Sequence, residues 1–292
     1  AMNLARKHSR ESFGAVRFDI ITALASFLGR TFGAISATGQ HKVRIGFDPV
    51  VPGFRYVPFG NIDALRQEVS SRTCAIMLEP VQGEGGVNVP PPGYLKAVNE
   101  LCNEKDLLLI FDEVQVGCGR TGNLWAYEQE GIKPDIMTLA KALAGGAPIG
   151  ALLTTGTLAE RLGPGSHGST FGGNPLVCAA ALAAMRAISD DGILEHCREM
   201  GTYLTGKLEQ LKDRYDFIKD IRGRGLIIGM ELAIEGGELV NAAMQRGLLI
   251  NCTVGNVLRF VPPLIVTEQE VDEAVAILDE VLAGVGPVEE TK

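Results

Sequence analysis

Short, almost wholly apolar runs alternate with stretches of helical periodicity through the first half of the chain, and this alternation limits the possible folds more than any other feature. The runs are TCAIMLE (73–79), LLLIFD (107–112), DIMTLA (135–140) and IGALLT (149–154). Such runs are typical of strands buried on both faces of a parallel sheet. The segment PGYLKAVNELCNEKD between the first two has apolar residues at helical spacing, which makes a β–α–β unit. The pattern predicts an α/β fold with a mostly parallel sheet and helices on both of its faces.

The pattern changes from Asn174 onward. Two long helical stretches, NPLVCAAALAAMRAI and ILEHCREMGTYLTGKLEQLKDRY, precede the strand pair expected in IRGRGLIIGMELAI. LRFVPPLIV and a helix over 268–282 close the fold, and the tail GPVEETK is expected to fray. We therefore predict a large domain over 1–186 and a smaller C-terminal α+β domain over 187–292.

Composition narrows the class of partner. The 292 residues carry a formal net charge of −8, which disfavours nucleic acid and anionic membranes and leaves a small molecule as the natural partner. No apolar run is long enough to span a membrane. The six cysteines include no C-x-x-C pair and the four histidines show no metal-ligand spacing, so we predict buried, reduced thiols, no metal and a cytoplasmic location.

Two polar residues follow predicted strands. Asp112 ends a buried run, at the carboxyl edge where open α/β sheets bind ligands, and Lys141 follows the next run. A protonated pyridine nitrogen would suit the carboxylate, and a partly buried lysine can act as a Schiff-base amine. The alternatives are an ion pair between Asp112 and Arg120 and an ordinary lysine whose stem lies on apolar surface. Taken together, Asp112 and Lys141 outline a site for pyridoxal 5′-phosphate (PLP).

Two glycine-rich segments add weaker signals. HGSTFGGNPL (167–176) places Ser169 and Thr170 before paired glycines and the start of a helix, where hydroxyls and amides can bind phosphate. An ordinary helix cap explains the same residues. EPVQGEGGV (79–87) follows a strand and, taken alone, indicates a plain turn more than a ligand-binding loop.

These segments, in this order and spacing, resemble the class III aminotransferases of PLP fold type I, and specifically the acetylornithine aminotransferases. The resemblance rests on EPVQGEGGVNVPPPGYLKAV, LIFDEVQVGCGRTG, PDIMTLAKALAGGAPIGA and HGSTFGGNPL. It runs from Ala1 to Leu282. The family's N-terminal segment, with a loop that holds the cofactor phosphate, has no counterpart before Ala1, so we expect the chain to start inside a helix and to bind PLP weakly as given.

The resemblance implies a cofactor site. Lys141 forms the Schiff base and moves the proton, Asp112 pairs with the pyridine nitrogen, and Gln115 lies near the phenolic oxygen. Phe27 stacks on the ring, although Leu28 stands where the family carries His. Thr170 reaches the phosphate bound by a neighbouring subunit, which implies a homodimer with shared active sites. The full cofactor-binding set implied is Phe27, Asp112, Glu113, Val114, Gln115, Lys141 and Thr170.

The resemblance also implies a substrate site. Arg30, with Ser169 close by, takes the carboxylate of N2-acetylornithine; alone, Arg30 would be read as a surface ion pair. Arg259 takes the α-carboxylate of glutamate and 2-oxoglutarate, since a guanidinium grips a carboxylate with two parallel bonds. Glu84 pairs with Arg259 when the δ-amino donor is bound.

The implied reaction is transamination of N2-acetylornithine with 2-oxoglutarate, which gives N-acetylglutamate 5-semialdehyde and glutamate and belongs to arginine biosynthesis. Two alternatives stay open. One is a sister class III enzyme acting on succinyl-diaminopimelate, ornithine or another ω-amine. The other is a non-catalytic protein with the PLP-enzyme fold.

Overall fold

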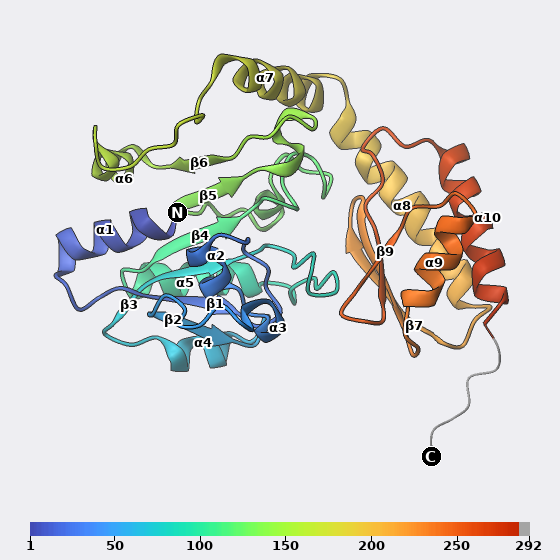
Figure 1. The fold of residues 1–292 in the computed structure, drawn as a ribbon, viewed down its shortest axis with the longest axis horizontal. Helices are drawn as coiled ribbons and strands as arrows, with labels where there is room; N and C mark the ends of the chain where they lie inside the picture. The colour runs from blue at the N-terminus through green and yellow to red at the C-terminus, as the bar shows by residue number, and fades with distance from the viewer. Residues whose placement is uncertain (286–292) are drawn as a thin grey trace. The chain divides into compact units, whose positions relative to one another are not determined.

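The computed structural model describes residues 1–285, and the predicted tail GPVEETK lies outside them. The chain divides into two compact units (Figure 1). The first unit comprises Ala1–Gln82, Pro90–Cys118 and Trp125–Ala187, and the second comprises Gly83–Val89, Gly119–Leu124 and the chain from Ile188 onward. Two short segments of the first half therefore cluster with the C-terminal part. The simple division into 1–186 and 187–292 stays a prediction.

The first unit is built on a six-stranded sheet, in the order β2-β1-β3-β4-β5-β6. β6 pairs antiparallel with β5, and the other neighbours are parallel. The strands are β1 (Asp19–Ala23), β2 (Phe54–Val57), β3 (Thr73–Leu78), β4 (Leu108–Asp112), β5 (Ile136–Leu139) and β6 (Ala151–Thr154). The mostly parallel sheet confirms the predicted α/β class, and β1 and β2 are strands that the apolar pattern did not reveal.

The prediction that 149–154 forms a parallel strand buried on both faces is wrong. β6 is antiparallel, and Leu152 and Leu153 are 36% and 42% exposed. A parallel return needs a crossover of a dozen or more residues, usually with a helix. The stretch 140–150 holds only the single 3₁₀ turn η2 (Lys141–Ala144), so the chain turns straight back.

Helices cover both faces of the sheet, as predicted. Along β3, Ile76 and Leu78 belong to one apolar cluster with α4 and α5, while Ala75 and Met77 belong to a second cluster with α1. The alternation follows because successive side chains of a strand point to opposite faces. The helices from Ala1 to Asp190 are α1 (Met2–Phe13), α2 (Phe32–Ala37), α3 (His41–Arg44), α4 (Ile62–Glu68), α5 (Tyr94–Glu104), α6 (Gly156–Ala159) and α7 (Pro175–Asp190), with 3₁₀ turns η1 (Ala126–Glu130) and η3 (Glu160–Leu162).

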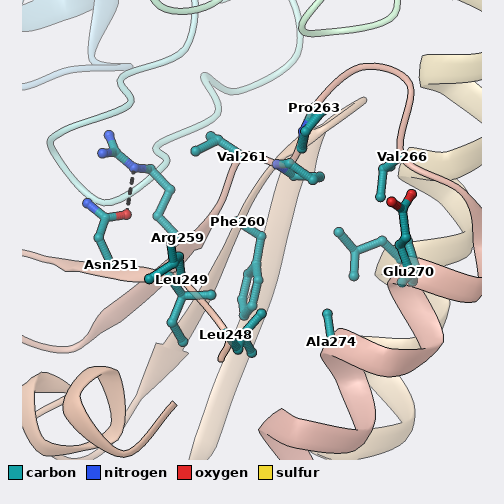
Figure 2. Close-up of a pocket in the computed structure, with 14 residues that line it drawn as sticks. Leu248, Leu249, Asn251, Arg259, Phe260, Val261, Pro263, Val266, Glu270 and Ala274 are labelled. Carbon is teal, nitrogen blue, oxygen red and sulfur yellow. Dashed lines mark hydrogen bonds between the residues drawn. The ribbon is translucent and has the colours of Figure 1, made fainter. Parts of the chain in front are cut away.

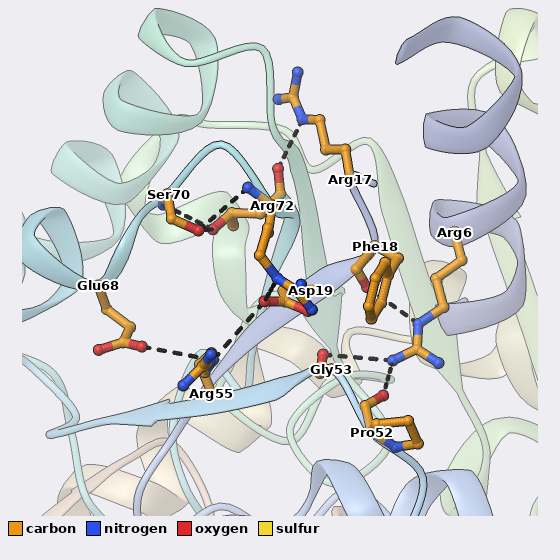
Figure 3. Close-up of polar contacts among 11 residues, drawn as sticks. Arg6, Arg17, Phe18, Asp19, Pro52, Gly53, Arg55, Glu68, Ser70 and Arg72 are labelled. Carbon is orange, nitrogen blue, oxygen red and sulfur yellow. Dashed lines mark hydrogen bonds and ion pairs between the residues drawn. The ribbon is translucent and has the colours of Figure 1, made fainter. Parts of the chain in front are cut away.

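A buried carboxylate organises the amino edge of this sheet (Figure 3). Asp19 begins β1 and is 2% exposed. Arg72, just before β3, donates to both of its oxygens from Nε and Nη2, at 3.0 and 3.2 Å. Arg55 on β2 lies 3.8 Å from the same carboxylate. A buried charge requires such partners, so the group ties together the starts of three adjacent strands.

The second unit contains an antiparallel sheet in the order β7-β8-β10-β9. Ile221, Ile228, Met230 and Leu258 point from it into an apolar cluster built with the flanking helices. The predicted strand pair and the closing helix are both present. The elements are α8 (Ile193–Lys212), β7 (Ile218–Arg224), β8 (Ile227–Leu232), α9 (Gly237–Gln245), β9 (Asn251–Thr253), β10 (Val257–Phe260) and α10 (Glu268–Ala283).

The cysteines depart in part from prediction. All six are free thiols and four are buried, but Cys178 on α7 is exposed and Cys252 is half-buried. Within residues 1–285, none of the helices combines the length and the apolar character that crossing a bilayer requires.

Candidate active site

A pocket lies at the carboxyl edge of the sheet in the first unit. Asp112 ends β4, Glu79 directly follows β3, and Lys141 follows β5. Parallel neighbours end at the same edge, so their terminal side chains converge. The pocket is lined by Phe27, Leu28, Gly29, Glu79, Asp112, Val114, Gln115 and Lys141. The structure thus brings five of the predicted cofactor residues into one place.

Asp112 is a buried acid with few compensating contacts. It is 7% exposed, and burial raises the pKa of its carboxyl to about 6, against the lowering effect of the Val114 amide and the nearby charge of Lys141. The Val114 amide donates to Oδ1 at 3.0 Å. Arg120, the alternative partner, donates instead to the carbonyls of Leu226 and Pro262. The carboxyl is therefore suited to a cationic ligand group.

Lys141 is more exposed than predicted. The sequence suggested partial burial after a strand, but the residue opens a 3₁₀ turn and is exposed. Its φ is 47°, in the left-handed region that non-glycine residues seldom adopt. Backbone of this kind costs on the order of 1–3 kcal/mol and clusters at functional sites. The turn directs the lysine into the pocket that contains Asp112.

Hydrogen bonds fix the segment that carries Phe27. The Phe27 amide donates to Glu79 Oε2 at 3.0 Å, and the Leu28 amide donates to Thr38 Oγ1 at 3.0 Å. The guanidinium of Arg30, itself exposed, lies 5.0 Å from the centroid of the Phe27 ring. Glu79 was missed as a site residue, although it shows the same signal as Asp112, a carboxylate at the end of a buried run.

Glu113 lies outside the lining of this pocket. Its carboxylate accepts from the amides of Ala126 and Tyr127, both at 3.0 Å, and it is 1% exposed. Burial raises the pKa of the Glu113 carboxyl to about 7. The side chain therefore holds the start of η1 in place, and a direct contact with the cofactor stays a prediction.

Ser169 and Thr170 are not brought to the pocket. Both are exposed. Ser169 lines a separate hollow of the first unit, with Thr31, Thr138, Gly150 and His167 among its other residues. The contact of Thr170 with the cofactor of a neighbouring subunit stays a prediction.

The second unit contains an ion pair between a buried arginine and a half-buried glutamate. Arg259 on β10 is 9% exposed, and its Nη1 lies 2.8 Å from Oε1 of Glu84. Its Nε donates to Asn251 Oδ1 at 3.2 Å (Figure 2). Glu84 and Arg259 are thus paired in this structure, and that they stay paired when the δ-amino donor is bound remains a prediction; Asn251 was missed. The pocket beside Arg259 is mainly apolar, with Leu248, Leu249, Phe260, Val261, Pro263 and Val266 in its lining.

Comparison with known proteins decides the family. The model of the family described as Aminotransferase class-III matches residues 1–282. This chain belongs to the class III aminotransferases. Among curated relatives, the acetylornithine aminotransferase of Caldanaerobacter subterraneus is 53% identical, over 97% of this chain and 72% of its own length. That of Methanocaldococcus jannaschii is 49% identical, over 96% of this chain and 71% of its own length.

Solved structures confirm that the class III aminotransferase has the predicted fold. The ornithine aminotransferase of Toxoplasma gondii ME49 superposes with a TM-score of 0.92 at 36% identity, covering 97% of this chain and 69% of that one. The acetylornithine aminotransferase of Elizabethkingia anophelis gives a TM-score of 0.83 at 34% identity, covering 97% and 70%. The predicted cofactor, PLP, is that of the family.

The pocket of this class III aminotransferase has the chemistry that PLP needs. A buried carboxyl with a raised pKa suits a protonated ring nitrogen, because the positive charge of the ring offsets the loss of hydration that burial imposes on the carboxylate. An amine, from Lys141, and an aromatic ring, from Phe27, line the same pocket. These residues therefore fit the cofactor.

Proposed function

We propose that the protein transfers the δ-amino group of N2-acetylornithine to 2-oxoglutarate, in arginine biosynthesis. The observation that carries this proposal is the joint presence of Asp112 and Lys141 in one pocket of a chain 53% identical to an acetylornithine aminotransferase. A sister reaction with ornithine is the second candidate, because an ornithine aminotransferase gives a TM-score of 0.92.

Each pocket residue has a task in this proposal. Bound PLP supplies an electron sink that stabilises negative charge on the reacting carbon. Asp112 would keep the ring nitrogen protonated, Phe27 would orient the ring, and Gln115 would contact the phenolic oxygen. Lys141 would hold the cofactor through its Nζ, and the same amine would accept and return the proton of the carbon that carries the amino group.

Arg259 and Glu84 select between the two substrates. A dicarboxylate offers a second carboxylate that can replace Glu84 on the guanidinium of Arg259. An acylated ω-amine donor is bound with the Glu84–Arg259 pair intact, while its carboxylate is held by Arg30 with Ser169 nearby. Arg259 thus binds substrate in the glutamate half-reaction and is paired with Glu84 in the half-reaction of the acylated donor.

A homodimer completes the proposal. Three apolar side chains on or just before α7 are exposed: Phe171 is 81% exposed, Leu176 80% and Leu182 54%. Thr170, next to Phe171, is proposed to reach the phosphate bound by the second copy. An apolar surface of this kind is typical of a subunit interface. We place the enzyme in the cytoplasm, in keeping with its free thiols.

Borohydride reduction tests the cofactor site directly. After incubation with PLP and reduction, mass spectrometry of the peptides should find the pyridoxyl group on Lys141. The Lys141→Ala variant should lose both this adduct and transamination, whereas Lys133→Ala, which removes an exposed lysine before β5, should keep both. Adduct on another lysine, or normal turnover by Lys141→Ala, would show that the site is elsewhere. Comparing N2-acetylornithine with ornithine as donor separates the two candidate reactions.

A further inference from the structure

One loop of the second unit crosses a face of its sheet. Gly229 on β8 is the register neighbour of Arg222 on β7 and of Arg259 on β10. Cross-strand neighbours share a face, so the two arginines stand on the same side with Gly229 between them. A Cβ placed on Gly229 would lie 2.9 Å from Cβ of Val87, so the loop Gly83–Val89 passes directly over this glycine. The opposite face carries the apolar cluster described above.

Arg222 clamps one end of this loop. Its Nε and Nη2 donate to the carbonyl of Gly86 at 3.1 and 2.7 Å, and Nε also donates to the carbonyl of Val87 at 3.1 Å. Its Nη1 lies 2.5 Å from Glu231 and 2.9 Å from Asp220. The planar guanidinium is thus oriented by carboxylates on one side and grips backbone on the other, a geometry that lysine does not reproduce.

Glu84 occupies the other end of the same loop. It contacts Arg259, while Arg222 holds the carbonyl of Gly86 two residues later. The loop has little stiffness of its own, because Gly83, Gly85 and Gly86 have no side chains and Gly86 adopts a φ of 110°. Two hydrogen bonds lie within the loop, from the Val87 amide to the Gly83 carbonyl at 3.3 Å and from Asn88 Nδ2 to the Gly85 carbonyl at 3.0 Å. Arg222 adds three hydrogen bonds from outside the loop, on the carbonyls of Gly86 and Val87, and so contributes to the position of Glu84.

We propose that Arg222 is a positioning residue for substrate selection: by fixing the loop at Gly86 and Val87, it holds Glu84 on Arg259. The proposal rests on the role given to Arg259 above. A ligand carboxylate that takes Arg259 must displace Glu84, and a clamped loop makes this displacement more costly than a loose one. Arg222 thereby sets how strongly the masked state resists a dicarboxylate, although it touches neither substrate.

Binding of glutarate, an unreactive dicarboxylate, measures this competition without turnover. By titration calorimetry, Arg222→Ala should bind glutarate about fivefold to tenfold more tightly than wild type, as expected for residues that couple through a shared loop. Glu84→Ala should tighten binding at least as much, and the double variant no further. Arg222→Lys keeps the charge but loses the two donor nitrogens of the guanidinium that hold the loop. Its affinity for glutarate should lie between those of wild type and Arg222→Ala. The matched control is Arg214→Ala, which removes an arginine paired with Asp279 in the same unit.

The outcomes distinguish the positioning role of Arg222 from the proposed role of Arg259 in binding substrate. Unchanged affinity in Arg222→Ala and Arg222→Lys, with tighter binding in Glu84→Ala, would overturn the positioning role alone. Tighter binding in the double variant than in Glu84→Ala would also overturn it, because Arg222 would then act by another route. Equal glutarate binding by Arg259→Ala and wild type would refute the proposed role of Arg259 itself. In turnover, a positioning role predicts a changed ratio between the two half-reactions, whereas loss of general stability lowers both alike.

Discussion

Replacing Asp112 by Asn should stabilise the PLP-free protein at high pH while it damages the cofactor site. Burial raises the pKa of this carboxyl from 3.8 to about 6. One pKa unit corresponds to 1.36 kcal/mol, so ionised Asp112 lowers the free energy of unfolding by at most about 3 kcal/mol. The folded-state pKa is the higher one. The free energy of unfolding is therefore free of this penalty below pH 3.8, where Asp112 is protonated in both states, and it falls as the pH rises through about 6. Asparagine keeps an oxygen for the Val114 amide and has no charge to bury.

Urea unfolding of the PLP-free protein between pH 4 and pH 8 tests this reasoning. The gain of Asp112→Asn over wild type should be close to zero at pH 4 and should approach about 3 kcal/mol at pH 8. Asp191→Asn, a change at an exposed aspartate, controls for the general effect of removing one negative charge. The variant should also bind PLP less tightly, since the ring nitrogen loses its partner. A gain independent of pH, or a loss of stability at pH 8, would show that burial does not raise the pKa of Asp112.

Two further substitutions test supporting contacts. Glu113→Ala leaves two backbone amides without their acceptor and should lower the free energy of unfolding by about 2–4 kcal/mol, whereas Glu113→Gln should lose less; an unchanged urea midpoint in the alanine variant would argue against the contact. Gly229→Ala places a Cβ 2.9 Å from Val87 and should displace the loop, tightening glutarate binding as Arg222→Ala does. Gly237→Ala, with no heavy atom within 4 Å of the added Cβ, should leave that affinity unchanged, and equal behaviour of the two glycine variants would contradict the packing argument.

Apolar patterning was sufficient for the central strands but not for the edges of the sheet. β3 and β4 are buried along almost their whole length, so their sequences are continuous apolar runs. β6 has an equally apolar sequence, yet its direction is set by the short connection before it, which a pattern of side chains does not encode. β1 starts with Asp19, a charge that is tolerable because Arg72 and Arg55, both distant in sequence, lie beside it, so its sequence gives a weak strand signal.

The candidate site was partly predictable for a similar reason. Asp112 and Lys141 follow buried runs, and the strand order brings such positions to one edge. Glu79 has the same local signal but was read as part of a turn. Arg222 carries no signal at all, because its importance arises from a loop distant in sequence that returns over Gly229. Contacts of this kind depend on tertiary structure and have no local pattern.

The carboxylate network at Asp19 has a consequence for how this enzyme can be altered. It lies at the amino edge of the sheet, whereas Glu79 and Asp112 lie at the carboxyl edge, and the six residues of β3 separate the edges by about 20 Å. Substitutions more than 7–10 Å apart with no shared partners usually have additive effects. Substitutions around Arg72 and Arg55 can therefore raise or lower the melting temperature without changing the chemistry at the carboxyl edge. A change at the opposite edge, such as Asp112→Asn, should in turn have the same effect on stability whether or not this network is intact.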